Sequence, residues 1–118
     1  MRQRLVAATA LLAFTLAGCT TVSVAANPIS KAWVGRSAGT FFAKYSPPLS
    51  DTDSGSSTIY NWRGGYTRIK QANGRTASVS CSARITVSES YVIRDITITS
   101  DRPGANGPSY CEELLAGQ

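Results

Sequence analysis

The side chains that most often do chemistry are few in this chain of 118 residues, and their spacing fits no common catalytic arrangement. Histidine is absent, so a histidine-dependent triad is excluded. No serine stands in a G-x-S-x-G turn. Glu112 and Glu113 are adjacent and would diverge on a helix, while the segment 104–107 lacks the lysine of a phosphate-binding loop. The sequence therefore predicts that the protein is not an enzyme.

The acidic residues and thiols do not match a metal site either. Asp51 and Asp53 begin like a calcium loop, but Trp62 stands at the twelfth position, where such a loop needs glutamate. Cys81 and Cys111 are the only thiols in the C-terminal half of the chain, and two thiols without histidine are too few for tetrahedral zinc. The sequence predicts no metal and no other cofactor.

The third thiol, Cys19, follows a segment of a different kind. Arg2 and Arg4 precede the uncharged run Leu5–Gly18. This run is shorter than the roughly 20 apolar residues of a membrane span. A basic start, a short apolar run and small residues at its end are typical of a secretory signal peptide.

The end of this leader, Leu16-Ala17-Gly18-Cys19, resembles the lipobox of bacterial lipoproteins. The resemblance implies cleavage before Cys19, and it implies diacylglycerol and an acyl chain such as palmitate on that cysteine. Thr20 in place of aspartate resembles lipoproteins sent to the outer membrane. We expect a lipoprotein signal peptide over 1–18, a flexible tether over 19–29, and one small domain over 30–118.

Cys81 and Cys111 are expected to form a disulfide, because an even pair of thiols in an exported chain meets an oxidising compartment. Cys81 lies on the apolar face of the regularly alternating segment 76–87. Cys111, Leu114 and Leu115 recur at helical spacing, so the second thiol is also expected to face the core.

The hydrophobic pattern predicts an α+β fold with a short N-terminal helix, a four-stranded antiparallel meander and a short C-terminal helix. Helices are expected over 37–45 and 109–115, and a loop over 46–57. Strands are expected over 57–62, 66–71, 76–87 and 91–100. We also expect a turn at 63–65 and a type I′ hairpin at Asn73-Gly74. In the last strand, Ile93 has the opposite parity to Ile96 and Ile98, so we expect a bulge near Arg94-Asp95 that puts all three on one face.

A possible partner-binding patch comprises Tyr60, Trp62, Arg63, Tyr66 and Arg68, which flank the expected turn at 63–65. Aromatic residues and arginine are the types that contribute most to interface energy. In the alternative interpretation, Tyr60 and Trp62 belong to the core and the cations belong to the wet face of the sheet. One arrangement satisfies both interpretations, with Trp62 buried and Arg63, Tyr66 and Arg68 exposed.

The segments Trp33–Ser37 and Ile59–Trp62, with the short amphipathic helix between them, resemble small lipoproteins of the SmpA/OmlA (BamE) type. They also resemble alphaproteobacterial envelope lipoproteins with a cysteine pair and a C-terminal helix. The first resemblance implies a role beside the machinery that assembles outer-membrane β-barrels.

Removal of Arg2 and Arg4 lowers the formal net charge from +5 to about +3. A periplasmic protein does not meet the genome, so this charge does not indicate nucleic acid. We expect a lipid-anchored, non-catalytic scaffold or adaptor on the periplasmic face of the outer membrane, with an envelope protein as partner. The alternatives are an inhibitor of a lysozyme or protease and a structural anchor to peptidoglycan.

Overall fold

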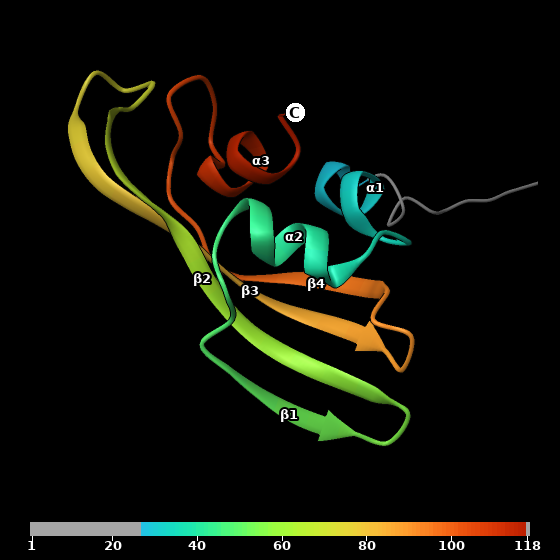
Figure 1. Cartoon of the computed structure of the whole chain (residues 1–118). Coiled ribbons are helices and arrows are strands. Elements are labelled where there is room, and N and C mark those ends of the chain that lie inside the picture. Colours follow the sequence, from blue (N-terminus) through green and yellow to red (C-terminus); the bar gives the residue numbers. More distant parts are fainter. Residues whose placement is uncertain (1–26, 118) are drawn as a thin grey trace, which may run out of the picture.

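The structure, a computed structural model, describes residues 27–117. Four strands form one antiparallel sheet in the order β1-β2-β3-β4, and all three helices lie on one of its faces (Figure 1). The α+β class and the meander predicted from the sequence are confirmed. In chain order the elements are α1 (Pro28–Trp33), α2 (Ala38–Lys44), β1 (Ser50–Ser54), β2 (Ser57–Lys70), β3 (Thr76–Ser88), β4 (Ile93–Ser100) and α3 (Tyr110–Leu115).

The two faces of the sheet differ because β3 alternates strictly between apolar and polar side chains. Its apolar set is buried under the helices: Val79, Cys81, Ala83, Ile85 and Val87. The intervening serine, threonine and arginine side chains are half-buried or exposed on the other face. This is the period-2 pattern of a sheet with one wet face, as the sequence predicts. We call that face the helix-free face.

The helices cover the sheet through a cluster of aromatic rings. Ser37 caps α2 by accepting a hydrogen bond from the Gly39 N–H, and Phe41 is fully buried. Trp33 is also fully buried, with its ring centroid 5.0 Å from that of Phe41. The indole N–H of Trp33 donates to the Leu115 carbonyl at 2.8 Å, so α1 is tied to the end of α3. Trp33 is therefore a core residue.

The predicted bond between Cys81 and Cys111 is present and joins β3 to α3. Both cysteines are fully buried, and their Cα atoms lie 5.2 Å apart. A second contact joins α3 to the sheet, because the Tyr110 hydroxyl donates to the Gly65 carbonyl at 2.5 Å. The C-terminal helix is thus held against β2 as well as β3.

The strand boundaries differ from the sequence prediction in two places. The expected loop over 46–57 contains β1, which pairs with β2 from Ser50 opposite Asn61 to Ser54 opposite Ser57. The expected turn at 63–65 is wrong, because β2 is continuous and carries a bulge between Gly64 and Thr67. The structure also adds helix α1. The expected tether therefore ends earlier than predicted, because Pro28 and Ile29 belong to α1 and Ile29 is buried.

The two remaining local predictions have different outcomes. The chain reverses at Asn73-Gly74 as expected, but only Gly74 has a positive φ, of 88°. A type I′ turn needs positive φ at both central residues, so the hairpin closes through a longer loop over 71–75. The bulge in β4 is confirmed, because Asp95 pairs with Thr86 and Ile93 with Val87, which leaves Arg94 between them.

Candidate partner-binding surface

The structure divides the predicted patch between the two faces of the sheet. Trp62 is 1% exposed, and its indole N–H donates to the Ser46 carbonyl at 3.0 Å, so it belongs to the core. Tyr60 is half-buried on the helix side, where its ring lies 5.2 Å from that of Phe42. Of the two interpretations of the patch, the structure fits the one in which Tyr60 and Trp62 belong to the core side of the sheet. Their even spacing along β2 directs both toward the helices.

The bulge in β2 brings the other three residues of the patch together. Gly64 pairs with Cys81 and Thr67 with Val79, so Ser80 alone stands opposite Gly65 and Tyr66. Arg63 and Arg68 are five positions apart and would point to opposite faces of a regular strand. Because the bulge inserts one extra residue, both lie on the helix-free face, where their partners Ser82 and Ser78 also lie.

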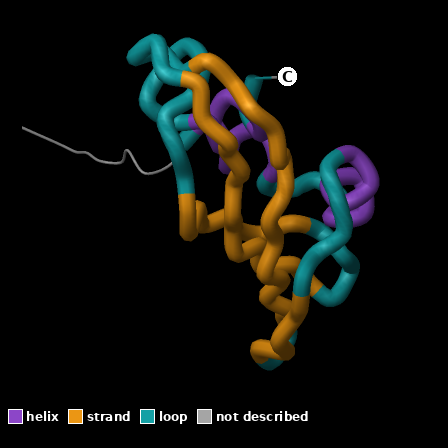
Figure 2. Tube along the Cα trace, turned by 90° about the vertical axis from the view of Figure 1, so that its left-hand side faces the viewer, coloured by secondary structure: helices purple, strands orange, loops and turns teal. Residues whose placement is uncertain are grey.

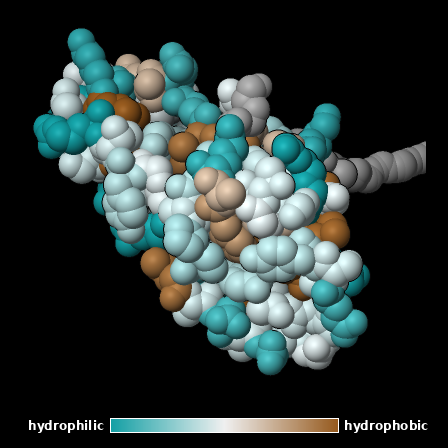
Figure 3. All heavy atoms as spheres, viewed as in Figure 1, coloured by the Kyte–Doolittle hydropathy of each residue, from teal (hydrophilic) through white to brown (hydrophobic). Residues whose placement is uncertain are grey.

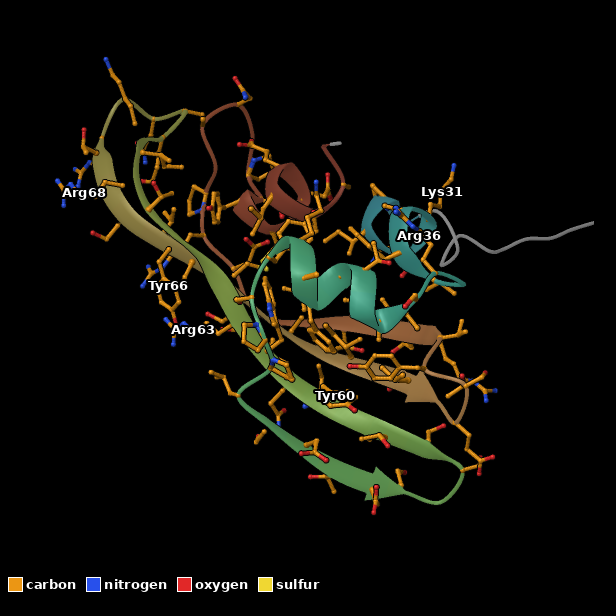
Figure 4. All side chains as sticks on the ribbon, in the orientation of Figure 1. Lys31, Arg36, Tyr60, Arg63, Tyr66 and Arg68 are labelled. Carbon is orange, nitrogen blue, oxygen red and sulfur yellow. A yellow bond between two sulfur atoms is a disulfide. The ribbon has the colours of Figure 1, made fainter. Side chains whose placement is uncertain are left out.

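We call Arg63, Tyr66 and Arg68 the Tyr66 patch; Figure 4 shows them along the outer side of the β2–β3 ribbon. Tyr66 is 68% exposed, the largest exposure among the bulky apolar side chains of the described residues. The guanidinium carbon of Arg63 lies 5.8 Å from the centroid of the Tyr66 ring. This separation is within the range of a cation–π contact.

Hydroxyl groups of β3 orient the two arginines. Arg63 donates from Nε to Ser80 Oγ at 3.1 Å, and Arg68 donates from a terminal nitrogen to Ser78 Oγ at 3.4 Å. No carboxylate within the described residues forms an ion pair with either guanidinium. Each guanidinium has further N–H donors, and it is suited to bidentate binding of a carboxylate or phosphate. The Tyr66 patch therefore presents two guanidinium groups whose remaining N–H donors could bind an anion.

The register between β2 and β3 identifies the serines that sequence analysis did not assign to the site. The alternation over 76–87 predicts only that Ser78 and Ser80 lie on the polar face of their strand. The alternation of β3 indicates the correct face, but the side-chain hydrogen bonds of these serines to Arg68 and Arg63 depend on the bulge. A long-range register of this kind is not encoded in the periodicity of either strand alone.

Two carboxylates of β1 lie on the helix side of the sheet. Asp51 stands opposite Tyr60 in the β1–β2 pair, and Asp53 follows it on the same face. Burial raises the pKa of the Tyr60 phenol, and Tyr91 and these two carboxylates raise it further. Figure 3, in the orientation of Figure 1, shows apolar side chains in small, separate areas of the visible surface. The cations of the Tyr66 patch and the carboxylates of β1 thus occupy different parts of the surface.

Among residues 27–117, no three histidine, cysteine, aspartate or glutamate side chains are grouped so that they could hold a metal ion. Over the same range, no helix has the length and apolar character needed to cross a membrane.

Comparisons of the chain with models of protein families, with curated proteins and with solved structures find no significant match. The resemblances to lipoproteins described above therefore rest on the sequence pattern.

Proposed function

We propose that the protein is a lipid-anchored, non-catalytic adaptor of the bacterial cell envelope. In this proposal Cys19 holds it in the outer membrane on the periplasmic side, and it serves outer-membrane assembly or integrity. The Tyr66 patch binds an acidic surface of an envelope protein. Cys19 lies outside the described residues, and the anchor rests on the motif Leu16–Cys19.

The observation that carries the adaptor role is the arrangement of the Tyr66 patch. An exposed tyrosine with two arginines is a combination enriched at the energetic centres of protein interfaces. The arginines are oriented by serines and have no carboxylate partner within the described part of the chain. Neither arginine is part of the core, so the folded domain does not require them for packing.

The test combines charge reversal with crosslinking in cells. The variant Arg63→Glu with Arg68→Glu is compared with Lys31→Glu and Lys44→Glu, which makes the same change in net charge at exposed positions on the two N-terminal helices. We expect the first variant to lose crosslinks to an envelope protein at least tenfold while its Tm stays within a few degrees of wild type. The second variant should keep those crosslinks.

Three results would overturn the proposal. Equal loss in both variants would mean that only net charge matters. Unchanged crosslinking in the first variant would place the partner surface elsewhere. Capture of a lysozyme or a protease that the protein inhibits would identify an inhibitor in place of an adaptor.

A further inference from the structure

The distal half of β2 has a free edge. β1 pairs with β2 only as far as Asn61, whereas β2 continues to Lys70. From Thr67 to Lys70 the described sheet gives β2 a neighbour on one side only, which is β3. Figure 2 shows this two-stranded ribbon rising beyond the rest of the sheet. The edge of β2 along Thr67–Lys70 is therefore open to pairing with one more strand.

The main-chain groups that face this open position can be assigned from the hairpin. The Gln71 N–H donates across the hairpin to the Arg75 carbonyl at 2.7 Å. Successive residues of an antiparallel strand point their N–H groups alternately to the two sides. Ile69 therefore faces β3 like Gln71, and the N–H and C=O groups of Arg68 and Lys70 face outward. Among residues 27–117, no main-chain hydrogen bond outside the sheet ladder uses these groups.

The side chains at the same edge define which strand could be added there. Arg68 and Lys70 both lie on the helix-free face, since they pair with Ser78 and Thr76. Both are exposed. Basic side chains and a bulge are the features that keep a free edge from pairing with a second copy of the same edge. The same cations favour a strand that carries carboxylates opposite them.

We propose that an extended acidic segment of the partner binds this edge as an added strand, with carboxylates at alternate positions opposite Arg68 and Lys70. Main-chain hydrogen bonds to Arg68 and Lys70 then supply affinity, and the charge pairs supply selectivity, as in other cases of strand addition. The inference rests on the proposed adaptor function and gives a binding mode at the edge of β2 that adjoins the Tyr66 patch and shares Arg68 with it.

Hydrogen exchange of individual amides gives a direct test. The probe is a synthetic nonapeptide that alternates threonine and glutamate, added to the full-length protein in detergent micelles. At a peptide concentration ten times Kd, the amides of Arg68 and Lys70 should exchange about tenfold more slowly. The Ile69 amide, already bonded to β3, should not change. A peptide of the same charge with proline at its centre should give less than half of this protection.

A matched pair of variants separates strand addition from attraction between charges. Lys70→Thr removes the charge and keeps the N–H, whereas Lys70→Pro removes both, and an outward-facing position on an edge strand tolerates proline. We expect Lys70→Pro to weaken peptide binding at least fivefold more than Lys70→Thr, at similar Tm. Equal weakening, or protection of neither Arg68 nor Lys70, would overturn strand addition. The proposed function would still stand if Arg63→Glu with Arg68→Glu abolished the crosslinks in cells.

Discussion

At the scale of single residues, the buried bond between Cys81 and Cys111 is the main covalent constraint on the described domain. It closes a loop with a sequence separation of 30 and holds the short helix α3 on the centre of β3. A six-residue helix has little stability of its own, so its position depends on such tertiary contacts.

We expect Cys81→Ser with Cys111→Ser to lower the free energy of unfolding by about 3.5 kcal/mol, the loop-closure estimate for a loop of this length. Urea unfolding of the exported protein measures the change. Wild type treated with a reductant should unfold at the same urea concentration as the variant. Two alkylatable thiols in natively exported wild-type protein would contradict the bond.

Three tyrosines make stability depend on pH in the alkaline range. Burial raises the pKa values of Tyr45, Tyr60 and Tyr110 above the usual 10.0. Above about pH 10 the unfolded chain loses these phenolic protons while the native chain keeps them, so the unfolded state binds fewer protons. Stability from this source is complete below pH 10 and falls as the pH rises through the native pKa values.

Urea midpoints measured between pH 8 and pH 11 should therefore be constant to about pH 10 and then decrease. Tyr110→Phe should have a smaller decrease above pH 10, because one titrating phenol is gone, and a lower midpoint throughout, because the bond to Gly65 is lost. A midpoint that rose above pH 10 would show that the native phenols ionise first.

At the scale of the elements, the bulge in β2 determines which side chains form the Tyr66 patch. Gly65 has a φ of 70°, and a Cβ built there would overlap Leu114 Cδ2. Gly74 has a similar φ of 88° but has no atom within 4 Å of such a Cβ. Both glycines thus have a positive φ that favours glycine, but only Gly65 packs against α3.

Gly74→Ala should cost about 1 kcal/mol, from the left-handed backbone alone. Gly65→Ala should cost about 2–4 kcal/mol, because overpacking against α3 is added to the same backbone term. Chemical denaturation of both variants gives the comparison. Equal costs would show that α3 does not rest on Gly65.

The sequence predicted those elements whose signal is local. The alternation of β3, the apolar face of α2 with its Ser37 cap, the helical spacing around Cys111 and the bulge at Arg94 could all be read from their own segments. β1 could not, because Ser50–Ser54 is exposed throughout and becomes a strand by main-chain pairing with β2. The glycines at 64 and 65 were interpreted as a turn because a glycine pair permits either a turn or a bulge. The bulge forms because β3 is long enough to pair with β2 on both sides of these glycines.

The candidate site could also be predicted only where its signal is local. The exposure of Arg63, Tyr66 and Arg68 and the burial of Trp62 follow one of the arrangements expected from the sequence. The bulge puts these three exposed residues on one face of the sheet. It also brings the two arginines within hydrogen-bonding distance of Ser78 and Ser80. The free edge of β2 depends on where β1 ends, and no local pattern indicates that position.

At the scale of the whole molecule, the proposed function requires one domain attached to a lipid anchor. A single acyl chain holds a protein only marginally at a membrane, whereas two or more chains on one cysteine hold it stably. The anchor would keep the Tyr66 patch close to envelope proteins and would prevent the protein from diffusing freely. The proposed adaptor role therefore requires the lipid anchor at Cys19 in addition to the Tyr66 patch.

The intact mass of the protein extracted from membranes tests this dependence most directly. We predict a chain that begins at Cys19 and carries a diacylglycerol and a further acyl chain, and that partitions into the detergent phase. Cys19→Ser should accumulate as the uncleaved precursor, without added lipid mass. A wild-type chain with an unmodified Cys19 thiol, or a Cys19→Ser protein processed and partitioned like wild type, would contradict the account.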